Sequence, residues 1–375
     1  MIRMLTVVGA RPQFVKAAII SRLVRSPAYR DRYHETFVHT GQHFDASMSA
    51  VFFEELGMDE PDHHLSISGG SHGAMTGAML ARIEEIALQA RPDLLLIYGD
   101  TNSTLAAALA ASKQGIPIAH VEAGLRNYIK RMPEEQNRII VDNLSTWLFC
   151  PTQQAITNLV KEGIVNHSQG RPGADAPRVV NVGDIMYDAS LRYRDRAFAR
   201  SAAQRLRARL SIEGKYRLLT LHRAENTDEP HRLAGIIAAI NTLDEMQIVF
   251  PVHPRTRNRL AEDGLVLGCH VKNVEPVGYL DMIELEADCE MVITDSGGVQ
   301  KEAFFFRKPC VNMYENSGWV EAVDAGWIVS SGAATDDIVA AVRGFKIPRE
   351  WTSLYGDGHT GQKILDEISR GLSRT

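Results

Sequence analysis

Three carboxylates in the first half of the chain occupy positions where an acid or base catalyst could act. Asp100 and Glu122 each follow a short apolar run, and Glu134 opens the amphipathic segment after the next loop. A carboxylate at a strand tip can accept or donate a proton. Helix capping is the competing explanation, since Asp100 opens a run of Thr, Asn and Ser, and Pro133-Glu134 is an ordinary helix start. Three such groups converging on one sheet edge favour proton-transfer chemistry.

Small and basic residues at other strand ends indicate sites for an anion. Arg11 and Lys16 follow Gly9 near a predicted helix start, which is either an anion site or a helix start with two solvated cations. The sharpest signal is the turn Ser296–Gly298, where free N–H groups at a helix start could hold a pyrophosphate and the Ser296 hydroxyl could donate. Glu302, one helical turn further, is placed to accept hydrogen bonds from ribose hydroxyls.

Histidines and arginines complete the set of candidate side chains. His222 and Arg223 follow one predicted strand and His253 follows another, and each histidine is as readily structural as functional. Arg138 lies in the helix that Glu134 opens. Neither G-x-G-x-x-G nor G-x-x-x-x-G-K-[ST] occurs, so a nicotinamide and P-loop ATP chemistry are not supported and we expect no cofactor.

The elements that carry these residues alternate between apolar runs and helix-period segments. Short runs that are apolar on both faces are typical of buried parallel strands joined by crossover helices. The predicted strands are Met4–Gly9, Glu35–Thr40, Leu94–Gly99, Ile116–Val121 and Trp147–Cys150, then Val179–Val182, Arg217–Leu221, Gln247–Val252, Met291–Thr294, Cys310–Met313 and Trp327–Ser330. Helices are predicted at Ala74–Ala90, Thr104–Lys113 and Gly361–Leu372. Two successive βα series predict an α/β protein with two Rossmann-like, doubly wound domains.

The loop 166–177, rich in Gly, Pro and polar residues, separates the two series. We therefore expect an N-terminal domain over 1–177 that carries the carboxylates, and a second domain over 178–360 whose first strand is Val179–Val182.

Composition bounds the class of protein. The chain has 375 residues, 45% of them hydrophobic and 23% charged, with a formal net charge of −5. These values exclude a disordered chain and argue against broad binding to nucleic acid or anionic membrane. No apolar run is long enough to span a bilayer, and the N-terminus has no signal-peptide layout. The four cysteines lack metal-ligand spacing, so we expect idle thiols in a reducing compartment, no metal site, and a cytoplasmic location.

Taken together, these motifs resemble the non-hydrolysing UDP-N-acetylglucosamine 2-epimerase family, which has the two-domain glycosyltransferase-B architecture. The resemblance runs end to end through GARPQFVK, GQH, GDTNST, HVEAGLR, MPEEQNR, VGD, HR, PVHP, TDSGGVQKE and YGDG. It implies an active site in the cleft between the domains and a last helix, 361–375, that returns to the first domain. It also implies that Ser296, Gly297, Gly298 and Glu302 grip UDP, that Arg11 and His222 lie on the phosphates, and that Asp100, Glu122 and Glu134 are the catalytic carboxylates.

The implied reaction converts UDP-N-acetylglucosamine to UDP-N-acetylmannosamine by elimination and return of UDP. Family members are commonly dimers, so a homodimer is implied as well. The alternatives are a glycosyltransferase of the same architecture, a hydrolysing relative that releases N-acetylmannosamine, and a non-catalytic nucleotide-sugar sensor. The two rival enzymes differ in their products, and the sensor would bind without turnover.

Two stretches depart from the family pattern. The GQH motif continues Phe44-Asp45-Ala46 instead of an Arg-x-Met-type stretch, so we expect no allosteric activation by substrate. The stretch 315–321, which contains Trp319, replaces a Thr-Glu-Arg-Pro-Glu segment and looks like relatives that epimerise UDP-2,3-diacetamido glucuronate. The pair Lys130-Arg131 could receive the carboxylate of that sugar, or simply be solvated. This sugar is therefore the second candidate substrate.

Overall fold

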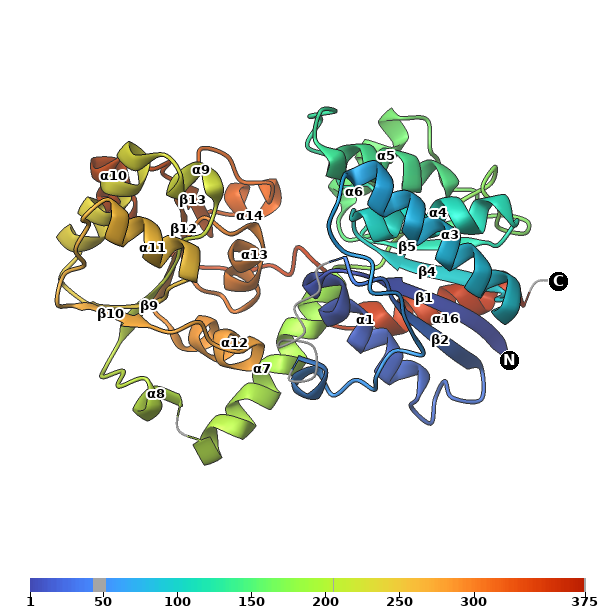
Figure 1. Ribbon diagram of the computed structural model, residues 1–375, viewed down its shortest axis with the longest axis horizontal. Helices are drawn as coiled ribbons and strands as arrows, with labels where there is room; N and C mark the ends of the chain where they lie inside the picture. The colour runs from blue at the N-terminus through green and yellow to red at the C-terminus, as the bar shows by residue number, and fades with distance from the viewer. Residues whose placement is uncertain (43–51, 205, 374–375) are drawn as a thin grey trace. The chain divides into compact units, whose positions relative to one another are not determined.

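The computed structural model describes residues 1–42, 52–204 and 206–373, which form two compact units. One unit comprises Met1–Ala189 together with Tyr355–Thr375, and the other comprises Ser190–Leu354. Helix α7 (Ile185–Gln204) runs from the first unit into the second. Each unit is built on one parallel sheet (Figure 1).

The first sheet has seven strands in the order β3-β2-β1-β4-β5-β6-β7, and all its pairs are parallel. The strands are β1 (Ile2–Val8), β2 (Tyr33–His39), β3 (His63–His64), β4 (Leu94–Tyr98), β5 (Ile118–Val121), β6 (Trp147–Cys150) and β7 (Arg178–Asn181). The helices are α1 (Arg11–Val24), α3 (His72–Ala90), α4 (Asn102–Lys113), α5 (Pro133–Leu144), α6 (Gln153–Lys161) and α16 (Thr360–Leu372).

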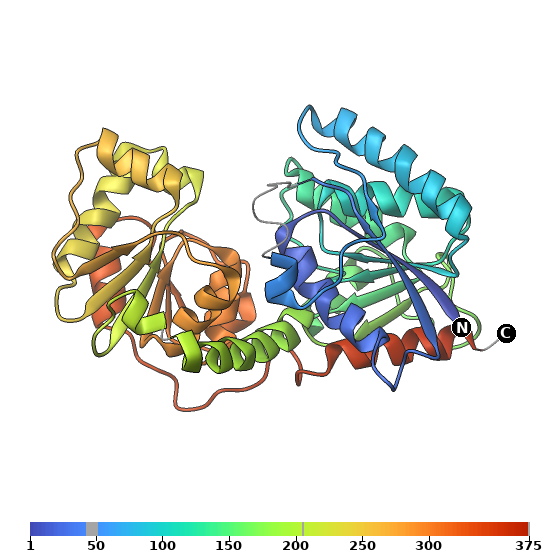
Figure 2. The ribbon, with the colours of Figure 1, turned by 60° about the horizontal axis from the view of Figure 1, so that its bottom comes forward.

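Helices cover both faces of this sheet, which is why its central strands are continuously apolar. Every residue of β4, Leu-Leu-Leu-Ile-Tyr, is fully buried. One core joins the sheet to α3, α4 and α5, and the alanines of α4 allow a close approach. On the opposite face α16 packs beside α1 (Figure 2). The last helix therefore completes the first unit.

The second sheet has six parallel strands in the order β10-β9-β8-β11-β12-β13. The strands are β8 (Tyr216–Thr220), β9 (Gln247–Pro251), β10 (Val271–Val274), β11 (Met291–Thr294), β12 (Cys310–Asn312) and β13 (Ile328–Ser330). The helices are α8 (Leu206–Arg209), α9 (Ala224–Thr227), α10 (Pro230–Thr242), α11 (Pro254–Glu262), α12 (Tyr279–Asp288), α13 (Gly297–Phe305), α14 (Val320–Asp324) and α15 (Thr335–Arg343). Two doubly wound α/β sheets confirm the predicted fold class.

Three differences from the sequence-based assignment have physical causes. Several predicted strands include one residue of the following turn, such as Gly9 and Gly99. The short edge strands β3 and β10 were not predicted, because two to four residues of mixed polarity carry no periodic signal. The prediction that Val179–Val182 begins the second sheet is wrong: β7 pairs with β6 and forms the edge of the first sheet. Its apolar pattern does not encode which sheet it joins.

Candidate active site

Both sheets reverse their strand order once, and most of the candidate residues follow the strands at those two points or a strand directly beside them. The order reverses between β1 and β4 in the first sheet and between β8 and β11 in the second. A crevice opens at such a switch point beyond the carboxyl ends of the strands. Gly9 follows β1 and approaches α4 so closely that a Cβ would lie 2.1 Å from Ser103 Oγ. Only glycine fits there.

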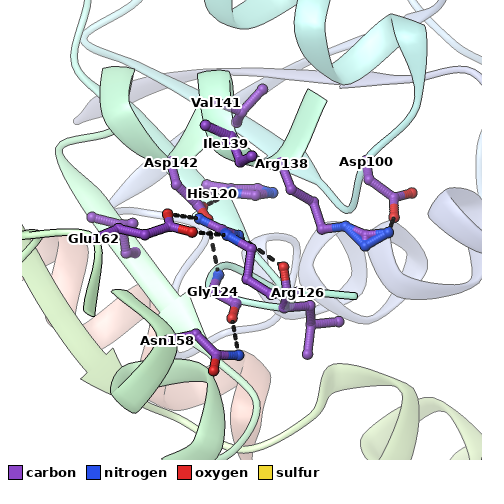
Figure 3. Close-up of polar contacts among 12 residues, drawn as sticks. Asp100, His120, Gly124, Arg126, Arg138, Ile139, Val141, Asp142, Asn158 and Glu162 are labelled. Carbon is purple, nitrogen blue, oxygen red and sulfur yellow. Dashed lines mark hydrogen bonds and ion pairs between the residues drawn. The ribbon is translucent and has the colours of Figure 1, made fainter. Parts of the chain in front are cut away.

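In the first unit the structure brings two ion pairs to this edge. Lys16, buried on α1, contacts Glu122 Oε2 at the end of β5. Arg138 Nη2 on α5 lies 3.4 Å from Asp100 Oδ2 at the end of β4 (Figure 3). Gly99, the residue before Asp100, lies beside the other pair: a Cβ at this position would lie 3.4 Å from Glu122 Oε2 and 3.8 Å from Lys16 Nζ. Because glycine has no side chain, the space between the two pairs stays open. The edge therefore presents two carboxylates and two cations side by side.

The electrostatics of Asp100 reflect this crowding. Burial is the largest cause of a pKa raised above the usual value for an aspartate. The Glu122 and Glu134 carboxylates raise the pKa further, while Arg138 and Lys16 oppose the rise. A carboxyl group with a raised pKa among other carboxylates is suited to carrying a proton.

The backbone at this edge is held in an uncommon conformation. Glu122 has φ +74°, in the left-handed region that side-chain-bearing residues rarely adopt. Its N–H donates to the Phe149 carbonyl at 3.0 Å, which helps to hold the turn. Strain of this kind at a strand end is characteristic of functional sites.

The two remaining residues predicted in this unit, Arg11 and Glu134, are exposed. Arg11 is the first residue of α1, and its guanidinium lies 5.2 Å from the centroid of the Phe52 ring. Glu134 is exposed on the first turn of α5 and acts on Asp100 through its charge. Its neighbour Glu135 is buried and accepts the N–H groups of residues 127 and 128, so Glu135 supports a loop.

In the second unit, helix α13 begins at the predicted anion site. Ser296 is the N-cap, and its hydroxyl accepts from the Val299 N–H at 3.5 Å. A hydroxyl that accepts in this way can still donate to a ligand. Gly297 and Gly298 open the helix without side chains, so a ligand can approach the backbone N–H groups.

A buried aspartate that the sequence analysis overlooked joins the two strand ends of this unit. Asp295 is fully buried and accepts the N–H groups of His222 at 3.2 Å and Arg223 at 2.9 Å. It thereby holds the turn after β8 against the turn after β11. The sequence feature that could have identified Asp295 is its position directly before Ser296. Aspartate is also common in turns, so its position before a Ser-Gly-Gly turn did not distinguish it.

Two aromatic side chains in this unit, Trp319 and Tyr314, contact cations, and Trp319 lies at the start of α13. Trp319 donates from Nε1 to the Gly297 carbonyl at 2.7 Å, and Lys301 Nζ lies 4.2 Å from the centroid of its ring. The Arg223 guanidinium lies 4.7 Å from the centroid of the Tyr314 ring. Two cations are thus held in place by aromatic faces.

Two further predicted residues have local structural partners. Glu302 lies near Glu286, whose pKa is raised well above the usual value by burial and then by the Glu302 charge. His253 is the N-cap of α11, and its Nδ1 accepts from the Arg255 N–H. A capping contact explains His253 without a ligand.

The prediction about allosteric activation depends on residues 44–46, which lie outside the described residues. Across the ranges that the structure describes, no three His, Cys, Asp or Glu side chains gather as a metal site would require. None of the helices described there combines the length and apolar composition needed to cross a bilayer.

Comparison with known proteins supplies independent information. Residues 28–369 match the family model described as UDP-N-acetylglucosamine 2-epimerase. A Pseudomonas aeruginosa protein named UDP-2,3-diacetamido-2,3-dideoxy-D-glucuronate 2-epimerase is 47% identical over 372 residues, covering 98% of this chain and 99% of its own length.

Two solved structures are similar over nearly the whole chain. The Methanocaldococcus jannaschii UDP-GlcNAc 2-epimerase in complex with UDP-GlcNAc and UDP is 37% identical, with a TM-score of 0.83, and the match covers 98% of this chain and 99% of that one. The Neisseria meningitidis UDP-GlcNAc 2-epimerase bound to UDP-GlcNAc is 27% identical, with a TM-score of 0.85, and the match covers 98% and 100%.

Proposed function

Because the chain belongs to the UDP-N-acetylglucosamine 2-epimerase family, whose members are isomerases, we propose that it inverts C2 of UDP-N-acetylglucosamine to give UDP-N-acetylmannosamine. The observation that carries this proposal is the cluster of Asp100, Glu122, Lys16 and Arg138 at the carboxyl edge of the first sheet. Carboxylates and cations in contact are what proton transfer next to a departing anion requires.

The chemistry follows from the weak acidity of the C2 hydrogen. Plain deprotonation at C2 would leave a carbanion without a neighbouring carbonyl group. If UDP departs from C1 as the C2 proton is removed, the C–H electron pair forms the C1=C2 bond and the C1–O pair leaves with UDP. The intermediate is 2-acetamidoglucal. Addition of a proton to the opposite face of C2 and return of the UDP oxygen to C1 complete the inversion.

We assign the proton transfers to the first unit and the retention of UDP to the second. Asp100, Glu122 and Glu134 exchange protons with C2 from different sides. The helix start at Ser296–Gly298 holds the diphosphate through its N–H groups, with a hydrogen bond from the His222 ring and the positive charge of Arg223.

Isotope labels test the route. In deuterated water, the UDP-N-acetylmannosamine formed from UDP-N-acetylglucosamine should carry deuterium at C2. An oxygen label that bridges C1 and the β-phosphorus should scramble into non-bridging positions, because the C1–O bond breaks in every turnover. Epimerised product with an unscrambled bridge would refute the elimination.

Substitutions test the assignment of residues. Asp100→Asn, Glu122→Gln and Glu134→Gln should each lower kcat by about 100- to 10,000-fold. The Kd for UDP should change little. Asp93→Asn is the matched control, since Asp93 precedes β4 where Asp100 follows it, and its pairing with Arg3 is at the surface. Near-normal turnover in two of the three variants would contradict the assignment of the proton transfers to these carboxylates.

A second candidate substrate is UDP-2,3-diacetamido-2,3-dideoxy-D-glucuronate. The 47% identity to the Pseudomonas aeruginosa protein supports it, as does Lys301, whose ammonium group lies on the ring of Trp319 in the stretch 315–321. Offering both nucleotide sugars in equal amounts decides between them. If the uronate is the substrate, Lys301→Met should lower kcat/KM for the uronate more than for the neutral sugar. Equal losses for both sugars would remove Lys301 from carboxylate recognition.

A further inference from the structure

Next to Asp100 lies a chain of charged side chains that the proposed mechanism does not use, and all of them except Glu162 are buried (Figure 3). His120 on β5 is fully buried; its Nδ1 lies 2.7 Å from Asp142 Oδ1 and its Nε2 lies 2.8 Å from the Gly99 carbonyl oxygen. Asp142 on α5 also pairs with Arg126, whose Nη1 lies 2.7 Å from Oδ2. Arg126 in turn forms a two-point contact with Glu162 at 2.7 and 2.8 Å.

The partners of His120 fix its protonation. The Gly99 carbonyl can only accept, so Nε2 carries a hydrogen. Burial alone would raise the pKa of Asp142, but hydrogen bonds and charges from His120 and Arg126 outweigh burial and lower it. Asp142 Oδ2 accepts from the buried Arg126 guanidinium and from the Gly124 N–H, which are the contacts of an ionised carboxylate. With both oxygens of Asp142 accepting, the 2.7 Å contact from Nδ1 to Oδ1 is a donation from the ring. The arrangement is then a charged ring and Arg126 facing the carboxylates of Asp142 and Glu162.

The two hydrogen-bond partners of His120 lead to the two catalytic turns. The Gly99 carbonyl belongs to the peptide group that joins Gly99 to Asp100, so a bond to this oxygen sets the plane from which Asp100 projects. Gly99 itself has φ +61°, a conformation that glycine adopts readily, so the hydrogen bond from His120 selects one of several backbone conformations open to it. On the other side, Asp142 Oδ2 accepts the Gly124 N–H at 3.1 Å. Gly124 is two residues beyond Glu122 and closes the turn in which Glu122 lies.

We propose that His120 and Asp142 are a positioning pair, in which a buried imidazolium and a carboxylate together fix the turns that present Asp100 and Glu122. The inference rests on the proposed function, because it assigns the pair to the residues that exchange protons with C2. His120 has no exposed surface, so it does not touch substrate itself. The neighbouring Cys150 adds no charge, because burial raises the pKa of its thiol well above the usual value.

Two substitutions separate hydrogen-bonding geometry from charge. His120→Phe keeps a planar ring but removes both donors, and it should lower kcat about 100-fold, as a small misplacement of catalytic groups does. Asp142→Asn keeps the shape but lets the amide donate to a neutral His120, and it should lower kcat about 10-fold, within the range seen when supporting partners are lost. In both variants KM and the Kd for UDP should stay within about 3-fold, because binding energy is retained.

Ser145→Ala is the matched control. Ser145 ends α5 and donates to the Val141 carbonyl at 2.7 Å, so its loss removes a buried hydrogen bond from the same helix without touching Gly99 or Asp142. This variant should lose stability but keep kcat.

Nitrogen-15 NMR of the histidine rings provides a readout that does not depend on activity. At neutral pH both His120 nitrogens should be protonated in the unmodified protein, and Nε2 alone in Asp142→Asn. A neutral His120 ring in the unmodified protein would overturn the proposal even if His120→Phe fails to fold. Unchanged kcat in folded Asp142→Asn would overturn it as well. If the unmodified protein turns over neither UDP-sugar, the proposed function is wrong. The NMR measurement then still shows whether His120 and Asp142 form an ion pair, because it does not depend on turnover.

Discussion

Replacing Gly124 by alanine should destabilise the first unit and slow the reaction together. A Cβ at this position would lie 2.5 Å from the Ala155 carbonyl oxygen and 3.1 Å from Leu159 Cγ, both on α6. Gly124 also has φ +78°. The left-handed conformation costs alanine about 1–2 kcal/mol, and forcing the contact with a backbone atom costs about 1–3 kcal/mol more. We therefore expect a loss of about 2–5 kcal/mol in the free energy of unfolding of this unit.

Gly115→Ala isolates the conformational part of this cost. Gly115 has φ +67° but nothing within 4 Å of its Cβ position, so the loss should be only about 1–2 kcal/mol. Hydrogen exchange of the amides in β4 and β5 measures the stability of the unit directly. The same preparations give kcat, which should fall in Gly124→Ala, because the Gly124 N–H no longer reaches Asp142, and stay unchanged in Gly115→Ala. Equal losses of protection in the two variants would refute the steric reasoning.

Three further outcomes are expected. Tyr33→Phe removes the hydroxyl that donates to the Leu365 carbonyl on α16. Thermal unfolding should show a free energy of unfolding lower by about 1 kcal/mol, and the Kd for UDP should not change. Asp295→Ala releases the His222 and Arg223 N–H groups, so calorimetry should show UDP binding at least about 10-fold weaker; an unchanged Kd would count against the role of Asp295. Because the pKa of Asp142 is lower in the folded state than in the unfolded state, its ionised carboxylate stabilises the fold at pH values above about 4, the unfolded-state pKa. This stabilisation is lost as the pH falls through the folded-state pKa of Asp142. The stability gap between the unmodified protein and Asp142→Asn should therefore narrow on acidification below about pH 4.

The ends of the strands β4 and β5 could be located from the sequence because local patterns encode them. Asp100 and Glu122 were identified as candidate residues because a polar residue directly after a continuous apolar run is visible without any knowledge of packing. The sheet to which β7 belongs was not predictable in this way, because the same four residues could pair with either edge.

The buried charge network was invisible for a related reason. His120 and Asp142 are 22 residues apart and meet only when α5 packs on the sheet. A histidine inside the apolar strand Ile118–Val121 was a usable signal, since a buried imidazole needs partners, but it did not name them. Asp295 shows the same limit, because its partners come from a different strand end.

The return of α16 to the first unit has a consequence for the order of folding during synthesis. The second unit is one continuous segment, Ser190–Leu354, and all of its residues have left the ribosome before α16 does. The first unit begins earlier in the chain, yet until α16 is made it lacks the helix whose Ile364, Leu365 and Ile368 are completely buried against it. We infer that the core of the first unit is completed only after the whole of the second unit has been translated.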